Sequence, residues 1–420
     1  MRSSEVIYNK FGLHKMHDNR YDSYESRMLH LVSIDCGFLF YIVSLTIWLI
    51  YMIFQSSMLG AYLSHVNAIR YICLGLALFS LLFNRDITAR DIIAVVVFAI
   101  FASIPAAVGE RMIIDVLLFA YCGRKHSFRK IAKYVCITTS VCLIIVIVCA
   151  YTGFIENYIQ VINGRVRHFM GFVYALRPAQ YSFLITLLVV YLRGDSIKLV
   201  ELACLAVVNL FIFLMANTRL SFYLSVAVIV SAIALRGNIE RFFSIKFIRV
   251  AFTYIFIIMS IIALAFTLCY SPTNDIASSI NSWLGGRLSM GKIAIDSYGI
   301  HLFGQYLPLV GGSIDYTGYF KTQDYTYFYL DSLYIRILSQ FGIVFFAGFL
   351  GAMTAVMRLL FYKREYWLIL VVAFVAVHAL IDDLVLFLQY DTFLLLIGYL
   401  ATNADKCDAN EIRMPIPILD

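Results

Sequence analysis

The apolar residues of this chain gather into long blocks, about the twenty residues that a membrane-spanning helix needs, separated by polar stretches. One of these polar stretches is much longer than the others. The pattern predicts about twelve helices, near residues 36–55, 68–84, 91–107, 108–122, 131–152, 171–192, 199–217, 220–236, 249–269, 333–361, 366–384 and 385–402.

The composition agrees with a membrane location. Hydrophobic residues make up 62% and charged residues 14% of the 420 residues, and the mean hydropathy is +0.84. Soluble globular chains carry roughly 45–50% apolar and 25% charged residues. We therefore expect an all-α polytopic integral membrane protein with about twelve transmembrane helices, forming a single membrane domain over residues 1–420. The net charge of +7 comes mostly from predicted cytoplasmic loops and indicates no nucleic-acid partner.

The basic residues predict the orientation. With the N-terminus in the cytoplasm, 23 of the 33 Lys and Arg residues fall on the cytoplasmic side, as the positive-inside rule requires. Both termini are then cytoplasmic, with tails over residues 1–34 and 403–420. The stretch 270–332, between the ninth and tenth helices, becomes one large external loop. In the fourth helix, the least apolar, Arg111 and Asp115 are expected to pair across one turn.

The predicted external loop has two parts. In the first, Ile280, Trp283 and Ile295 belong to an amphipathic pattern that predicts one or two short helices on the membrane surface. The second part is rich in Tyr and Phe, including Tyr327. Aromatic rings can stack on the apolar faces of sugars while tyrosine hydroxyls find polar partners. An aromatic belt at the membrane interface is the alternative for any single tyrosine.

Basic residues on the predicted outer face are the candidate ligand-binding groups. Positive charge normally collects in cytoplasmic loops, so its presence outside needs a reason. An anionic ligand in the outer leaflet would supply that reason, although one isolated arginine could simply extend to lipid headgroups. The residues concerned are Arg165, Arg167, His168, Arg177, Arg219 and Arg287.

Four short motifs, taken in order, resemble those of a known family. They are GRVRHFMGF (164–172) with RPA (177–179), NTRLS (217–221), GGRL (285–288) with LFGQ (302–305), and DSLYI (331–335) followed by Gly342. Together they resemble the Wzy-type O-antigen and capsular polysaccharide polymerases, to which the O-antigen ligases are closely related. The resemblance covers roughly residues 130–360.

This resemblance implies a GT-C-like glycosyltransferase in the bacterial cytoplasmic (inner) membrane. Such an enzyme polymerises undecaprenyl-pyrophosphate-linked oligosaccharide repeat units at the outer face, so its partners are a lipid-linked glycan donor, a lipid-linked acceptor and the lipid bilayer. A chain-length regulator and a flippase of the same pathway are further expected partners. The chain contains no D-x-D triplet and no CxxC pair of cysteines, so we expect no metal and no cofactor. Direct transfer from the lipid pyrophosphate predicts inversion at the anomeric carbon.

The expected chemistry assigns roles to particular residues. Arg219 and Arg287, with Arg165 and Arg167 beside them, are expected to hold the pyrophosphate, because a guanidinium binds phosphate oxygens in pairs and stays ionised. The glycan is expected to contact Tyr327 and Tyr334.

A base must also take the proton of the acceptor hydroxyl. Asp331 stands where the related ligases carry a histidine, and His301 is the second candidate. His168 is the third, since imidazole titrates near neutral pH. Asp331 also precedes a predicted helix, so capping of that helix is the alternative explanation for it.

Three other functions remain open. A ligase that transfers lipid-linked glycan to a lipid acceptor would share the fold and the arginines, but Asp331 in place of histidine favours a polymerase. A flippase or transporter also suits twelve spans with embedded charges, yet the chain has no evident repeated halves. A purely structural membrane protein leaves the outer arginines unexplained. Asp382 and Asp383 are expected to lie at the outer side, with one of them paired to an embedded arginine.

Overall fold

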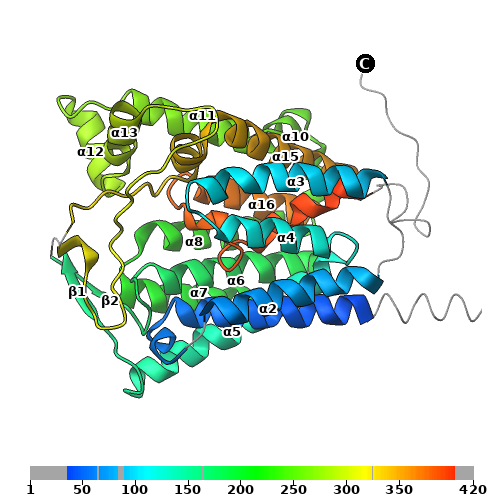
Figure 1. Cartoon of the computed structure of the whole chain (residues 1–420), viewed down its shortest axis with the longest axis horizontal. Coiled ribbons are helices and arrows are strands. Elements are labelled where there is room, and N and C mark those ends of the chain that lie inside the picture. Colours follow the sequence, from blue (N-terminus) through cyan, green and yellow to red (C-terminus); the bar gives the residue numbers. More distant parts are fainter. Residues whose placement is uncertain (1–35, 64–65, 84–88, 163, 324, 403–420) are drawn as a thin grey trace, which may run out of the picture.

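The computed structural model describes residues 36–63, 66–83, 89–162, 164–323 and 325–402 and is mostly helical. The predicted tails 1–34 and 403–420 lie outside these described residues. The helices run lengthwise through the molecule, and the hairpin β1–β2 lies with α12 and α13 at one end of the bundle, on the left in Figure 1. The candidate site lies at this end.

The first half of the described chain is built largely from long helices. They are Cys36–Gln55, α2 (Val66–Phe79), α3 (Ala89–Ala107), α4 (Met112–Gly123), α5 (Phe128–Tyr151), α6 (Arg177–Arg193), α7 (Leu199–Ala216) and α8 (Arg219–Leu235). Between α5 and α6 the chain forms strands β1 (Ile159–Ile162) and β2 (Arg165–His168).

The second half mixes long helices with short ones. The α-helices are α9 (Ile239–Ser244), α10 (Lys246–Thr253), α11 (Ile255–Leu268), α12 (Asp275–Trp283), α13 (Arg287–Tyr298), α14 (Leu333–Arg336), α15 (Gly342–Tyr362) and α16 (Tyr366–His378). A π-helical turn, Ile337–Phe341, joins α14 to α15. The 3-10 segments of the described chain are Met58–Tyr62, Ser80–Phe83, Gly194–Ser196, Lys321–Gln323, Leu384–Leu386 and Thr392–Ala401.

The helix exteriors are those of a membrane protein. Five described helices are long and apolar enough to cross a membrane, or six if the bent pair α10–α11 counts as one span, and five further apolar helices have 10–17 residues. Large apolar side chains cover their outer faces: Ile93 on α3 is 62% exposed and Val207 on α7 is 65% exposed. A soluble protein rarely leaves such continuous apolar surface to water. The expectation of a mostly helical membrane protein therefore agrees with the structure.

Three predicted helices have different limits. The helix expected over 171–192 begins only at Arg177, because Met170 (φ 52°) and Gly171 (φ 82°) turn the chain and Pro178 suits the first turn of a helix. The helix expected over 249–269 is the pair α10–α11, bent by 66°. The helix expected over 366–384 ends at His378.

The last predicted helix, 385–402, is not an α-helix. Residues 379–391 are turns and irregular chain apart from the short 3-10 segment Leu384–Leu386, and Thr392–Ala401 is a 3-10 helix. Four polar side chains of this stretch, namely Asp382, Asp383, Gln389 and Asp391, are at most 7% exposed. Irregular backbone at this depth is tolerated where protein surrounds it or where it lines a cavity. The hydropathy of the segment predicted its burial. It did not predict that Asp382 would accept a hydrogen bond from Gln180 or that Asp383 would accept one from Arg336.

The hairpin β1–β2 is an element that the hydropathy pattern does not predict. Its antiparallel register pairs Ile159 with His168 and Ile162 with Arg165. Successive residues of a strand point to opposite faces, so Arg165 and Arg167 share one face of β2, while His168 lies on the other. The side chain of His168 therefore points away from those of Arg165 and Arg167, although the three residues are close in sequence.

Asp115 pairs with a different arginine from the one expected. It accepts two hydrogen bonds of 2.7 Å from Arg70 and one of 3.0 Å from Trp48 Nε1, while Arg111 contributes only its backbone carbonyl to Arg70 (2.8 Å). The predicted Arg111–Asp115 pair is wrong because both oxygens of Asp115 are engaged by Arg70 and Trp48. Arg111 is the N-cap residue of α4, which begins at Met112.

Two of the sequence motifs meet in space. Gly304 and Gly342 both have positive φ (85° and 83°), and a Cβ on Gly304 would overlap the carbonyl oxygen of Gln340. This close approach explains why both positions require glycine. The backbone hydrogen bonds that join the two segments are Gln305 N to Gln340 O (2.9 Å), Ile343 N to His301 O (3.0 Å) and Val344 N to Leu302 O (3.1 Å).

Candidate active site

A cavity of about 500 Å³ lies between the start of α6, the chain leading to α14 and the irregular segment after α16. Its volume falls within the range of about 300–1,000 Å³ that is typical of small-molecule sites. Its aromatic lining consists of Tyr174, Tyr306, Tyr325, Tyr327 and Tyr329. Its charged and amide lining consists of Arg177, Gln180, Asp331, Asp382 and Asp383. Sugar-sized ligands need this combination of ring faces and hydrogen-bonding groups.

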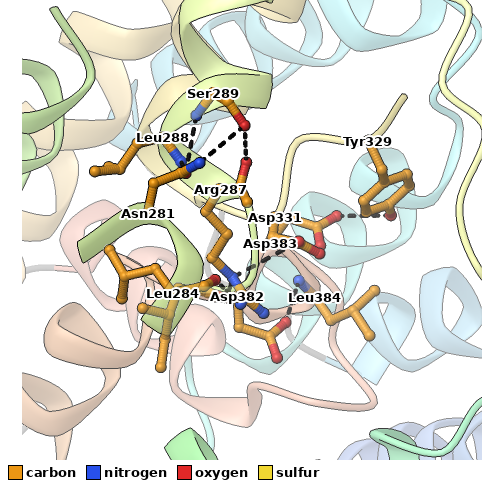
Figure 2. Close-up of polar contacts among 12 residues, drawn as sticks. Asn281, Leu284, Arg287, Leu288, Ser289, Tyr329, Asp331, Asp382, Asp383 and Leu384 are labelled. Carbon is orange, nitrogen blue, oxygen red and sulfur yellow. Dashed lines mark hydrogen bonds and ion pairs between the residues drawn. The ribbon is translucent and has the colours of Figure 1, made fainter. Parts of the chain in front are cut away.

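Asp331 lies at the edge of the cavity beside Arg287. Its Oδ2 is 3.6 Å from Arg287 Nε, and the Asp331 side chain is 18% exposed. Figure 2 shows the guanidinium of Arg287 among Asp331, Asp382 and Asp383. The N-cap of α14 is Ser332, and no side chain caps this helix. Capping of the helix therefore does not account for Asp331.

The surroundings of Asp331 suit proton transfer. Burial raises the pKa of this carboxyl to about 7, and Asp383 and Asp382 act in the same direction, while Arg287 opposes the rise. A general base works best when its pKa lies near the operating pH. Burial also raises the pKa of Tyr174 and Tyr327, with a further contribution from Asp331, so both phenols stay protonated and can donate hydrogen bonds.

The two aspartates after α16 are fixed by different partners. Asp383 accepts hydrogen bonds from Tyr329 Oη (2.9 Å) and from Arg336, so the expected pairing with an embedded arginine is confirmed. Asp382 accepts from the Leu384 backbone N–H (2.9 Å) and from Gln180 Nε2. These bonds hold the two carboxylates on the cavity wall, where they act on the charge of Asp331.

Arg287 is placed by the turn between α12 and α13. Asn281 Oδ1 accepts hydrogen bonds from the backbone N–H groups of Leu288 (3.0 Å) and Ser289 (3.1 Å). These bonds cap the first turn of α13, whose first residue is Arg287. Arg287 Nε donates to the carbonyl of Ile381 at 2.9 Å. The guanidinium is therefore tied to the segment that carries Asp382 and Asp383 (Figure 2).

Three other predicted arginines gather near Arg287. Burial lowers the pKa of Arg167, Tyr174 opposes this change, and the charges of Arg165, Arg287 and Arg219 lower it further. Arg167 Nε is buried without a hydrogen-bond partner. Asp331 is the one carboxylate of the described chain within 4.0 Å of any of these four arginines. Four cations with so little compensation are the kind of arrangement that an anion would stabilise.

We call Arg165, Arg167, Arg219 and Arg287 the arginine cluster. Arg165 and Arg167 come from one face of β2. Arg219 is the first residue of α8, reached through Asn217 in the left-handed conformation (φ 51°) at the end of α7. Segments more than 120 positions apart in sequence thus supply one cluster at the hairpin end of the molecule.

The other predicted site residues lie elsewhere. His301 is exposed, and its Nε2 is 3.1 Å from the Tyr298 carbonyl. Tyr334 is fully buried and donates to the Ala376 carbonyl (2.8 Å), so it belongs to helix packing. His168 lies on the opposite face of β2 from the arginine cluster. Arg177 lines the cavity, where Tyr390 accepts a hydrogen bond from it. Tyr327 lines the cavity as expected.

Several residues of the site carry no signal in one sequence. Gln180 lies one turn after Arg177 on α6, a mostly apolar helix that also carries Ser182 and Thr186. Asn281 looks like any polar residue of an amphipathic helix. Tyr174 and Tyr329 belong to aromatic-rich stretches in which no member stands out. Only the folded structure shows that these side chains, and not their neighbours in sequence, belong to the site.

The arrangement allows a definite kind of chemistry. Arg287 belongs to the arginine cluster and also lies beside Asp331, so an anionic leaving group and a carboxylate base can serve one reaction centre. Asp331 in turn lines the tyrosine-rich cavity, where a hydroxylated ligand can bind. Comparison with protein-family models, with curated proteins and with solved structures finds no match to this chain.

Proposed function

We propose that the chain is a glycosyltransferase that polymerises lipid-pyrophosphate-linked oligosaccharide repeat units into a surface polysaccharide. The observation that carries the proposal is the 3.6 Å approach of Arg287 Nε to Asp331 Oδ2, where the arginine cluster meets the tyrosine-lined cavity. A pyrophosphate needs fixed cations, and a sugar needs aromatic faces and hydrogen-bonding groups. The order of the four sequence motifs supports the same function.

In the proposed reaction, an acceptor sugar hydroxyl attacks the anomeric carbon of the donor glycan. A new C–O bond forms as the bond to the pyrophosphate oxygen breaks, and the electron pair leaves with the pyrophosphate. The hydroxyl proton passes to Asp331. The arginine cluster holds the pyrophosphate as its negative charge grows, which lowers the barrier most when the cations are already in place. Attack from the face opposite the leaving group inverts the anomeric configuration.

The proposal includes an arrangement in the membrane. About twelve spans, with both termini in the cytoplasm, would put the hairpin, α12 and α13 at the outer face of a bacterial cytoplasmic membrane. Lipid-linked donor and acceptor would then reach the site from the bilayer, with a flippase supplying repeat units and a chain-length regulator acting on the product. The apolar exteriors of α3 and α7 support the membrane location.

The test deletes the gene from the source strain and restores it as wild type, Arg287→Ala or Arg219→Ala. Surface polysaccharide is resolved on gels, and membrane fractions are blotted for the protein. We expect the deletion and both arginine variants to reduce the ladder to a single repeat unit. Lys292→Ala is the matched control, since Lys292 is a cation on the same helix, α13, and its Nζ pairs with Asp296 (3.4 Å). This variant should restore the ladder.

Each other result has a definite meaning. A normal ladder from Arg287→Ala protein would rule out the pyrophosphate role of the arginine cluster. Loss of all attached glycan, with polymer accumulating on its lipid carrier, would identify a ligase. A ladder unchanged by the deletion would reject polymerase and ligase together and would favour a transporter.

A further inference from the structure

Arg177 is set apart from the arginine cluster by its surroundings. It begins α6, and its side chain lines the cavity. Its Nη1 donates to the hydroxyl of Tyr390, and its guanidinium carbon lies 5.7 Å from the centre of that ring. The groups that act most strongly on its charge are the phenols of Tyr390, Tyr181 and Tyr329. No member of the arginine cluster is among them.

Arg177 also lacks the carboxylate partner that each buried arginine of the described chain has. Each buried arginine of the described chain forms an ion pair of at most 3.1 Å with a carboxylate. The pairs are Arg70 with Asp115, Arg124 with Asp91, and Arg336 with Asp383 and Glu110. Arg177 is in none of the ion pairs of the described residues, and its Nε is buried without a hydrogen-bond partner. A cation in this setting is stabilised when an anion joins it.

The neighbouring polar groups leave room for a ligand. Gln180, one turn further along α6, is 3% exposed and lines the same cavity. Its Nε2 donates to Asp382, and its Oε1 has no partner. Asp382 also accepts from the Leu384 N–H, so both of its oxygens are engaged. The cavity thus offers Arg177 as a donor and Gln180 Oε1 as an acceptor.

We propose that Arg177 and Gln180 form a subsite for a sugar that carries a carboxylate, such as a hexuronic acid. The planar guanidinium matches a carboxylate, Gln180 Oε1 would accept from a ring hydroxyl, and the tyrosines cover the sugar faces. Pyrophosphate is the other anion in the proposed reaction, but the arginine cluster already provides its site. The inference rests on the proposed function and adds acidic repeat units as the substrate class.

The test measures binding directly, without turnover. Full-length protein in lipid nanodiscs is titrated with D-glucuronate, D-galacturonate and the corresponding neutral hexoses, and binding is followed by saturation-transfer NMR. The wild type should bind at least one of the two acids about tenfold or more tightly than its hexose, because charge-assisted hydrogen bonds are the stronger ones. Arg177→Gln should remove this preference, and Arg177→Lys should keep only part of it. Arg219→Gln should keep it fully.

Inorganic pyrophosphate distinguishes the two anions. It should bind Arg177→Gln as it binds the wild type, and it should bind Arg219→Gln less tightly. Equal binding of acid and hexose by the wild type would overturn the inference, even if a variant fails to fold. Loss of pyrophosphate binding in Arg177→Gln, with the sugar-acid preference retained, would overturn it too. A normal polysaccharide ladder from Arg287→Ala would instead count against the proposed function, so the two failures are separate.

Discussion

Replacing Asp331 with asparagine keeps the shape of the side chain and removes its ability to accept a proton. Burial raises the pKa of the Asp331 carboxyl from 3.8 to about 7, although Arg287 opposes the rise. A carboxyl with the ordinary pKa would be ionised throughout the physiological range, whereas Asp331 titrates within it. If Asp331 is the base, only its ionised form is active, and the rate of glycan transfer must fall on the acid side.

The size of the effect follows from that pKa. A group with a pKa of about 7 is roughly one-tenth ionised at pH 6 and roughly nine-tenths ionised at pH 8. The wild-type rate should therefore rise about tenfold between these values and then level off. A positioned base contributes about 10²- to 10⁴-fold to a rate, so Asp331→Asn should lose about that much and also lose the rise with pH.

The assay uses full-length protein in nanodiscs with the lipid-pyrophosphate-linked repeat unit of the source strain. Initial rates of chain extension are measured on gels between about pH 5.5 and 8.5, a range that spans the expected transition. Asp296→Asn is the control. This carboxylate lies on α13, its side chain is 57% exposed, and it pairs with Lys292. Its removal should change neither the rate nor the pH profile.

Two results would refute this reasoning. A wild-type rate that stays flat across the whole range would show that no group with a pKa near 7 governs the transfer. An Asp331→Asn rate within about threefold of wild type would show that Asp331 is not the base. After the latter result, His301 would be the next candidate base only if the chain from 299 to 305 moved toward the cavity. In the structure His301 is exposed, and its Nε2 is hydrogen-bonded to the Tyr298 carbonyl.

Three further predictions concern stability and positioning. Asp383→Asn should destabilise the folded protein by up to about 3 kcal/mol, since it weakens the compensation of the buried Arg336, and an unchanged unfolding temperature in detergent would contradict this. Asp115→Ala should lower that temperature strongly, whereas Arg111→Ala should shift stability by less than about 0.5 kcal/mol; equal effects would restore the pairing expected from the sequence. Asn281→Ala should cost about 1 kcal/mol and shorten the polysaccharide with protein levels maintained, as read from blots and gels; a wild-type ladder would show that the cap does not position the site.

Much of the bundle could be predicted because each apolar block is a local feature of the sequence. The helix Cys36–Gln55, helices α3, α5 and α7, and the continuous helical run Leu333–Tyr362 lie close to their predicted positions. The hairpin was missed because each strand has four residues, too few for a clear alternating pattern. The end of α16 was not predicted because hydropathy indicates the burial of residues 379–391 but does not indicate that Asp382 and Asp383 have distant partners.

The site was predicted in part for a similar reason. Outward-facing arginines are conspicuous by type and by predicted side, so Arg165, Arg167, Arg219 and Arg287 could be named, and the structure brings them together. Arg177 meets the same criteria but lies in the cavity, because strand β2 and helix α6 direct their side chains to different places. Which acid neutralises which arginine depends on contacts across many residues, 47 between Arg336 and Asp383, and local spacing does not encode them.

The glycine contact between Gly304 and Gly342 has a mechanical consequence. It binds the chain at Gln305 to the π-helical turn, and the buried Leu330 (2% exposed) holds the chain again just before Asp331. The stretch between these two points carries the tyrosines at 306, 325, 327 and 329. It is also held to the bundle by the hydrogen bonds from Ile314 N to Val173 O (2.9 Å) and from Tyr329 Oη to Asp383 (2.9 Å). Asp331 lies beyond the second point and Arg287 lies before the first. The spacing between base and cation is thus set outside the stretch that would contact the glycan, so substitutions among these tyrosines can alter sugar choice without moving the reacting groups.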